Sequence, residues 1–323
     1  MNYDINLAII GFGKWGYNHV NTASNLLEPS RITVCDSDES TREKLQKISV
    51  DIKFTQNADE ITCNPEINAV IIATPAETHF EIAKKVLDAG KNVLVEKPIT
   101  LFSSEAEKLL KLAKEKDRIL MVGHVLLYHP AILKIKKMLD DGVLGKLQYI
   151  YSNRLNLGTI RSEENILWSF APHDISVIQF FTGNNPVEIY AKGASFLQHE
   201  IEDTTLTFMK YPDNVSAHIF VSWLHPFKEQ RLVVIGDKGM VVFEDSLPDE
   251  KLKFYKKGFQ KVEGVLEKFD LDYQVVEFEN KMPLAEEQKH FFECIAEGKD
   301  PITDGLHALE VLKILEESQR GLE

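Results

Sequence analysis

Short, continuous apolar runs recur through the first third of the chain, and segments with helical periodicity separate them. Five of these runs are strand candidates: Asn6–Ile10, Arg31–Asp36, Ala69–Ala73, Asn92–Glu96 and Ile119–Val122. Their apolar positions are continuous rather than alternating. We therefore expect strands that are buried on both faces of a parallel sheet.

Helical patterns fill the intervals between these runs. In His79–Gly90 the apolar residues recur at helical spacing, and Gly90 stands where a left-handed C-terminal cap is expected. Ser104 and Glu107, at the start of Ser104–Lys116, have the spacing of a capping box. The alternation of strands and helices predicts a doubly wound, right-handed α/β domain over residues 1–123.

The pattern changes after residue 123. Pro130–Asp141 is predicted to be one helix, with Pro130 at its first position. Longer β-type runs follow, joined by tight turns, so residues 124–323 are predicted to form a second α/β domain with an open, mainly antiparallel sheet. Residues 245–283 alternate only weakly, and a buried helix is expected over Leu306–Ser318, on either domain. The β-type runs are Lys146–Leu155, Val187–Leu197, Thr204–Tyr211, Val215–Trp223, Arg231–Gly236 and Met240–Phe243.

Composition narrows the class of partner. The chain has 323 residues, which fits two domains, and 37 basic against 50 acidic side chains give a net charge of −13. This acidic balance argues against a nucleic acid or an anionic membrane as partner. Three scattered cysteines form no disulfide framework and no zinc motif, and no signal peptide or membrane-spanning run is visible. We expect a cytoplasmic protein without a metal site.

The first strand candidate runs into a glycine-rich loop, Gly11-Phe12-Gly13-Lys14-Trp15-Gly16, which opens a helix. Asp36 ends the next strand, 20 residues after Gly16. This is the context that a dinucleotide-binding loop requires: Gly11 permits a tight turn, Gly13 a close approach of pyrophosphate, and Gly16 close helix packing. Asp36 would accept bonds from ribose hydroxyls and repel a 2′-phosphate, which favours NAD over NADP. A glycine-rich turn with another ligand, or none, is the alternative.

Four further motifs accompany the loop, and together they carry a family resemblance. They are Thr74-Pro75 with His79, Glu96-Lys97-Pro98, Gly123-His124, and Ala171-Pro172-His173-Asp174. With the glycine loop, they resemble the Gfo/Idh/MocA family of NAD(P)-dependent sugar oxidoreductases over nearly the whole chain. The resemblance implies an N-terminal Rossmann domain and a C-terminal α/β domain with an open sheet. It also implies a homodimer or homotetramer joined through those sheets.

Residues 149–170 resemble a narrower group within the family. Arg154, Asn156, Arg161 and Trp168 lie in a stretch similar to that of enzymes which oxidise the C3 hydroxyl of nucleotide-linked amino sugars. This group is related to the 3-dehydrogenases of UDP-N-acetylglucosamine and its uronate, and it implies a nucleotide-sugar substrate. Two positions depart from the family: Ser169 stands where most members have an acidic residue, and Leu127 stands where an arginine is common.

Oxidising a secondary alcohol requires a proton acceptor at the hydroxyl and stabilisation of the developing negative charge. His173 is the first candidate for the acceptor, since neutral imidazole titrates near working pH. Lys97 ends a parallel strand, where the cofactor crevice is expected, so it is the candidate for charge stabilisation and also a possible proton relay. The alternatives are a solvated lysine and a structural histidine near a helix N-terminus. The sequence does not separate the two catalytic roles.

The remaining candidates each have a structural alternative. His79 is a cofactor contact or a packed capping residue, and His124 is a crevice residue or a core histidine. Arg154 and Arg161 are phosphate ligands or solvated strand residues, and Trp168 is a pocket wall or a core anchor. The predicted cofactor-binding set is Gly11, Phe12, Gly13, Lys14, Trp15, Gly16, Asp36, Thr74, Pro75, His79, Glu96, Lys97 and His124. The predicted substrate-binding set is Lys97, Arg154, Asn156, Arg161, Trp168, His173 and Asp174.

Three functions are therefore under consideration. The first is an NAD-dependent dehydrogenase acting at C3 of a nucleotide-linked amino sugar, namely UDP-N-acetylglucosamine or its uronate. The second is a dehydrogenase of free sugars or cyclic polyols such as inositol. The third is a non-catalytic NAD-binding sensor or regulator, which the presence of both Lys97 and His173 disfavours.

Overall fold

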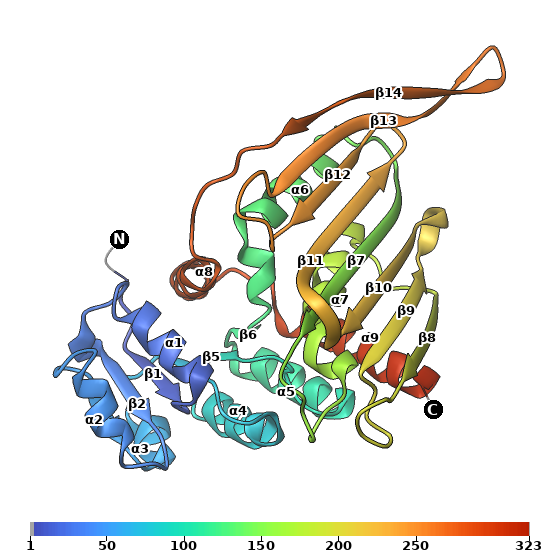
Figure 1. Ribbon diagram of the computed structural model, residues 1–323. Helices are drawn as coiled ribbons and strands as arrows, with labels where there is room; N and C mark the ends of the chain where they lie inside the picture. Colours follow the sequence, from blue (N-terminus) through green and yellow to red (C-terminus); the bar gives the residue numbers. More distant parts are fainter. Residues whose placement is uncertain (1–2, 323) are drawn as a thin grey trace. The chain divides into compact units, whose positions relative to one another are not determined.

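A computed structural model describes residues 3–322, and it divides them into two compact units (Figure 1). The first unit holds residues 3–128 together with Lys281–Leu312. The second holds His129–Asn280 together with residues 313–322. No helix within residues 3–322 combines the length and the apolar character needed to cross a bilayer.

The first unit is built on a six-stranded parallel sheet in the order β3-β2-β1-β4-β5-β6. Five strands confirm the sequence prediction, and β1, β4 and β5 are buried along their whole length. The sixth, β3, has three residues, too few for a recognisable pattern. The order reverses between β1 and β4, which is where doubly wound folds open a ligand crevice. The strands are β1 (Leu7–Ile10), β2 (Ile32–Cys35), β3 (Lys53–Thr55), β4 (Ala69–Ile72), β5 (Asn92–Val95) and β6 (Leu120–Val122).

Helices alternate with these strands as the periodicity predicted. Gly90 has φ +73°, so it forms the expected left-handed end of its helix. The predicted capping box is wrong: helix α5 begins at Ser103 with Phe102 at the cap position, so Ser104 lies inside the first turn. The helices are α1 (Lys14–Ala23), α2 (Thr41–Gln46), α3 (Ala58–Cys63), α4 (His79–Asp88), α5 (Ser103–Lys116) and the 3₁₀ helices η1 (Pro29–Arg31), η2 (Ala76–Thr78) and η3 (Val125–Tyr128).

A segment from near the C-terminus folds with the first unit. Residues 281–305 were predicted to belong to the second domain, but they lie in the first unit, and the helix that was expected over residues 306–318 on either domain begins there too. Val122 of β6 donates a backbone hydrogen bond to Thr303 at 2.8 Å, and Asp304 forms a bridge with Met121. Helix α8 (Pro283–Glu297) packs on α1 and η3. Helix α9 (Gly305–Leu322) begins in this unit and ends in the second.

The second unit contains an eight-stranded sheet in the order β14-β13-β12-β11-β7-β10-β9-β8. Only β7 and β10 pair in parallel, which confirms the open, mainly antiparallel prediction. Strands β13 and β14 form a long hairpin, all of it within residues 245–283, where the sequence alternates only weakly (Figure 1). The strands are β7 (Leu147–Leu157), β8 (Glu188–Ala194), β9 (Thr204–Lys210), β10 (Ser216–Ser222), β11 (Leu224–Gly236), β12 (Met240–Glu244), β13 (Leu252–Val262) and β14 (Val265–Val275).

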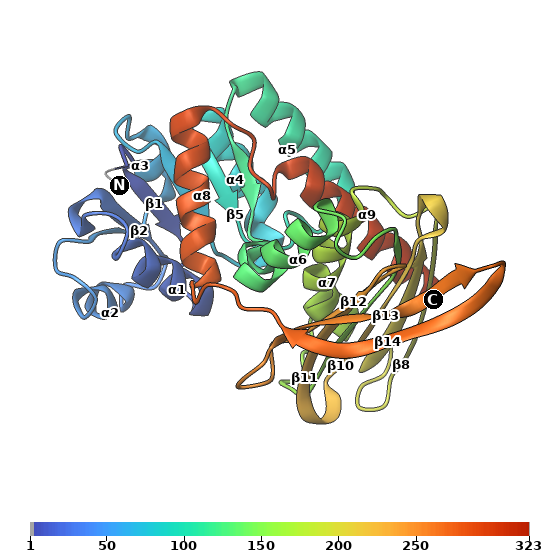
Figure 2. The same ribbon diagram turned by 90° about the horizontal axis from the view of Figure 1, so that it is seen from above.

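Helices of the second unit gather on one face of this sheet (Figure 2). The first, α6 (Pro130–Asp140), has Pro130 at its start, and the His129 side chain caps it by accepting the Ala131 N–H at 3.1 Å. The second, α7 (Ile166–Thr182), packs on β7, β9 and β10. Helix α7 was not predicted from the sequence, because it is apolar on nearly every side and contains Pro172. A 3₁₀ turn, η4 (Pro212–Asn214), joins β9 to β10.

Candidate active site

The glycine loop has the geometry that a dinucleotide requires. Gly11 has φ +93°, and a Cβ there would lie 2.7 Å from the Ala73 carbonyl oxygen. A Cβ on Gly16 would lie 2.0 Å from the Gly11 carbonyl oxygen, so the helix can pack this closely against the loop only with glycine at position 16. A Cβ on Gly13 would meet nothing within 4 Å. Open space therefore lies beside Gly13, where α1 begins without a side-chain cap, and these residues fit a bound pyrophosphate.

Asp36 is fixed beside this loop. Its Oδ2 accepts the Phe12 N–H at 2.6 Å, and its Oδ1 accepts the Asp38 N–H at 2.8 Å. The carboxylate is held at the end of β2 and close to the glycine loop, the position from which a ribose is bound in this fold. Lys14 and Trp15, within the glycine loop, are exposed in the first turn of α1.

His79 ties two loops of the crevice together. Its Nδ1 lies 2.8 Å from the Pro98 carbonyl oxygen, and its Nε2 lies 2.9 Å from the Thr74 carbonyl oxygen. His79 is 1% exposed, so it is a packed residue, which was the structural alternative to a cofactor contact. Thr74 is half-buried and accepts a bond from the Thr78 hydroxyl at 2.7 Å, while Pro75 is exposed.

Glu96 and Lys97 follow β5 at the carboxyl edge of the parallel sheet. The Glu96 side chain is buried, and its Oε1 lies 2.8 Å from Nε2 of His19 on α1. Its Oε2 accepts the backbone N–H of Lys97 at 3.2 Å. Gly123 is needed behind this carboxylate, because a Cβ there would lie 3.0 Å from Glu96 Oε2. Lys97 itself is half-buried.

His124 is a buried histidine that shares its surroundings with a residue the sequence analysis missed. Its ring lies 5.5 Å from that of His307, on the first turn of α9. Burial lowers the pKa of His124 well below its ordinary value, and the nearby His307 and Lys97 lower it further. Burial lowers the pKa of His307 to about 4. Both imidazoles are therefore neutral at working pH. No local sequence pattern marked His307, because it lies near His124 only through the folding of residues 281–312 into the first unit.

Helix α8 adds two buried side chains that the sequence analysis also missed. Glu287 and Gln288 are both 0% exposed. Gln288 Nε2 reaches His19, at 3.0 Å from Nδ1 and 3.1 Å from the carbonyl oxygen. Among the described residues neither carboxyl oxygen of Glu287 has a hydrogen-bond partner. Burial raises the pKa of Glu287 well above its usual range, and the charge of Glu96 adds to the effect.

In the second unit, His173 and Asp174 lie in the middle of α7. His173 is half-buried. Asp174 is buried and holds Arg154 of β7 in a two-point ion pair, with Nε at 2.8 Å from Oδ2 and Nη2 at 3.0 Å from Oδ1. The Ser152 hydroxyl donates a third bond to Asp174, at 2.6 Å. Arg154 was expected to bind a phosphate or to lie on a solvated face. Instead, its ion pair with Asp174 joins β7 to α7, next to His173.

The other substrate candidates surround the start of α7. Arg161 is exposed in the preceding loop and pairs with Glu164 at 2.8 Å. Trp168 is half-buried, and its Nε1 donates to Gln319 Oε1 at 3.1 Å. Asn156 lies near the end of β7, and its buried Oδ1 has no partner among the described residues.

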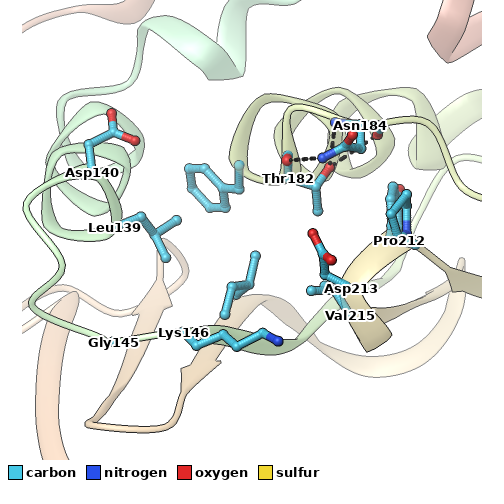
Figure 3. Close-up of a pocket in the computed structure, with 12 residues that line it drawn as sticks. Leu139, Asp140, Gly145, Lys146, Thr182, Asn184, Pro212, Asp213 and Val215 are labelled. Carbon is cyan, nitrogen blue, oxygen red and sulfur yellow. Dashed lines mark hydrogen bonds between the residues drawn. The ribbon is translucent and has the colours of Figure 1, made fainter.

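A pocket of about 290 Å³ opens elsewhere in the second unit, at the C-terminal end of α7 (Figure 3). Phe181, Thr182 and Asn184 line one side of it, and Lys146 and Asp213 line the other. His173 lies nine residues before Thr182 on the helix, about 13 Å along its axis at 1.5 Å per residue. The pocket is therefore separate from the predicted substrate residues.

The structure thus gathers the predicted cofactor residues on one sheet edge of the first unit. The predicted substrate residues other than Lys97 lie on β7, α7 and the loop between them, in the second unit. This arrangement defines a two-domain protein with a dinucleotide-type Rossmann domain and a second domain that carries further polar groups.

Comparison with known families agrees with this class. Residues 5–124 match the family described as "Oxidoreductase family, NAD-binding Rossmann fold", and residues 132–242 match the "GFO/IDH/MocA C-terminal domain". Together the matches cover most of the chain. The chain belongs to the GFO/IDH/MocA oxidoreductase family.

Individual relatives in the family act on different substrates. The chain is 25% identical to scyllo-inositol 2-dehydrogenase (NAD(+)) of Bacillus subtilis, covering 97% of this chain and 93% of that protein. It is also 25% identical to UDP-N-acetylglucosamine 3-dehydrogenase of Acidithiobacillus ferrooxidans, covering 94% and 93%. A solved structure of that second enzyme superposes with a TM-score of 0.83 at 23% identity, over 98% of this chain and 96% of the other. The last comparison confirms the fold.

Proposed function

We propose that this oxidoreductase oxidises the C3 hydroxyl of a UDP-linked amino sugar, UDP-N-acetylglucosamine or its uronate, with NAD as the hydride acceptor. The Glu96-Lys97 turn carries the proposal, because it ends a buried strand beside the dinucleotide crevice. The resemblance of residues 149–170 to enzymes of nucleotide sugars supports the substrate class, and so does the similarity to UDP-N-acetylglucosamine 3-dehydrogenase.

The glycine loop would hold the pyrophosphate through backbone N–H groups at the start of α1. Asp36 would accept bonds from the ribose hydroxyls, and its charge would disfavour a 2′-phosphate. Thr74 and Pro75 would contact the cofactor, and the buried side chains of His79, Glu96 and His124 would support that surface from inside the first unit. When bound, NAD supplies the chemistry of hydride acceptance from the sugar carbon.

Two side chains act on the oxygen side of the reaction. The Lys97 ammonium would stabilise negative charge as it develops on the alcohol oxygen, and the His173 imidazole would take the proton. The Arg154–Asp174 ion pair fixes the helix that carries His173. Arg161, Asn156 and Trp168 would contact the nucleotide sugar, with the exposed guanidinium of Arg161 suited to a diphosphate oxygen.

The second sheet supports assembly with further copies of the chain. Apolar side chains lie exposed on the sheet and its hairpin: Tyr190 is 58%, Leu206 47% and Phe259 65% exposed. On the hairpin, Val265 and Leu266 are as exposed as Phe259, and a group of exposed apolar side chains is typical of an interface between proteins. We propose a homodimer or homotetramer joined through this sheet.

The alternative substrate class is a free cyclic polyol, which the similarity to scyllo-inositol 2-dehydrogenase favours. Formation of NADH is measured with UDP-N-acetylglucosamine, its uronate and myo-inositol, and again with NADP in place of NAD. We expect turnover of a UDP-sugar with NAD. Turnover of inositol alone would contradict the proposed substrate, and turnover of none of them would favour a non-catalytic NAD-binding role.

Lys97→Ala tests the chemistry in the same assay. We expect kcat/KM to fall by roughly 10²–10⁴-fold while NAD still binds, because the variant loses the group at the developing charge. Lys114→Ala on α5, an exposed lysine, is the matched control and keeps wild-type activity. Unchanged turnover in Lys97→Ala would reject the catalytic assignment.

A further inference from the structure

Three buried side chains, linked by hydrogen bonds in series, lie behind the Glu96-Lys97 turn in the first unit. Gln288 on α8 contacts His19 on α1, and His19 contacts the Glu96 carboxylate at 2.8 Å. His19 and Gln288 are 0% exposed, and Glu96 is 7% exposed. Glu96 in turn accepts the backbone N–H of Lys97. These three side chains therefore connect α8 to the crevice through α1.

The contacts of Gln288 determine which way its amide faces. Its Nε2 lies 3.1 Å from the His19 carbonyl oxygen, which can only accept a hydrogen bond. The atom facing that carbonyl must therefore be the NH₂ group. The same nitrogen lies 3.0 Å from His19 Nδ1, so Nδ1 accepts a hydrogen bond and carries no proton.

This orientation fixes the tautomer of His19. A neutral imidazole without a proton on Nδ1 carries it on Nε2, and Nε2 faces Glu96 Oε1. His19 then donates to the carboxylate. In the other tautomer a lone pair of Nε2 would face a carboxylate oxygen, and the two acceptors would repel each other in a site closed to water.

We propose that Gln288 is a positioning residue of the cofactor crevice: it fixes the Nε2–H tautomer of His19, which holds the Glu96 carboxylate against the Lys97 backbone. The inference rests on the proposed placement of Glu96 and Lys97 at the cofactor. It assigns a role in the crevice to a residue from the returning C-terminal segment.

The tautomer is measured directly by ¹⁵N NMR of the wild-type protein labelled at histidine. The His19 signals are assigned by their loss in His19→Gln. We expect the ¹⁵N shifts of a neutral ring protonated at Nε2. Shifts of an Nδ1–H ring would overturn the proposal, and this measurement depends on no variant beyond the assignment.

A double-substitution cycle measures the consequence for the cofactor. Gln288→Leu is made in the wild-type chain and in His19→Gln, where the introduced side-chain amide can donate to Glu96 but has no second tautomer. We expect Gln288→Leu to raise the Kd for NAD about tenfold in the wild-type chain, since a bond to a charged group is weakened. In the His19→Gln background the same substitution should change the Kd by less than about twofold.

Gln179→Leu is the matched control, because it removes another buried glutamine amide, which bonds Asn185 and Tyr211 in the second unit. Its NAD affinity should equal that of the wild type. An equal loss of affinity for Gln288→Leu in both backgrounds, or no loss in either, would overturn the tautomer role. A wild-type protein that binds NAD but oxidises no sugar would contradict the proposed function and leave these affinities readable.

Discussion

Glu287 is a carboxyl group whose charge state is set by its burial in the first unit. Both of its oxygens lack partners among the described residues, and Glu96 is a nearby second carboxyl group. Because burial and this neighbour raise its pKa, the folded chain keeps the Glu287 proton at pH values where the unfolded chain releases it. The chain therefore takes up a proton when it folds. As pH rises from the ordinary pKa of Glu287 through its pKa in the folded chain, the free energy of unfolding falls.

Glu287→Gln removes this titration while keeping the size and shape of the side chain. We expect the variant and the wild type to differ little in stability near pH 4. At pH 8 the variant should be the more stable protein, as measured by thermal and urea unfolding. A stability difference for Glu287→Gln that is the same at both pH values would contradict the assignment.

Residues whose chemistry depends on near neighbours could be predicted from the sequence. Gly11 and Gly16 lie in one loop and have the tight turn and the close helix packing that were expected, and open space lies beside Gly13. The start of α6 at Pro130 is equally local. Gln288 and His307 escaped prediction because their partners, His19 and His124, are distant in the sequence. The pairing of Arg154 with Asp174 required knowing that α7 lies on β7.

Helices and strands could also be predicted only where the local sequence pattern was clear. The buried strands of the first sheet were predictable, because a strand covered on both faces is apolar throughout. The β13–β14 hairpin was not, because charged residues on both faces obscure its alternation and a Glu263-Gly264 turn closes it. Helix α7 escaped prediction for the opposite reason: it is apolar nearly all round, so it shows no amphipathic period.

The hairpin provides the test of assembly. Phe259, Val265 and Leu266 are each about two-thirds exposed near its tip. Replacing Phe259 and Leu266 with serine should leave the fold intact, since these side chains are largely exposed. It should shift the protein toward the monomer mass of 36.8 kDa in light scattering after size exclusion. A wild-type protein that is already monomeric, or a double variant with the wild-type assembly, would contradict assembly through the hairpin.

At the scale of the whole molecule, the chain divides its chemistry between two units. The dinucleotide loop and Lys97 belong to the first, and His173 with its Arg154–Asp174 support belongs to the second. The C-terminal segment contributes to both units, since α8 lies in the first and the end of α9 in the second. The sequence motifs indicated this division of roles, but the return of residues 281–312 to the first unit was visible only in the fold.

The account requires a substrate hydroxyl that meets both Lys97 and His173 while its carbon faces the nicotinamide. The most direct measurement is a crystal structure of the wild-type protein with NADH and UDP-N-acetylglucosamine. We expect the sugar C3 oxygen within about 3.2 Å of Lys97 Nζ and of a His173 ring nitrogen. Lys97 and His173 too far apart to reach one substrate oxygen in that complex would contradict the dehydrogenase mechanism.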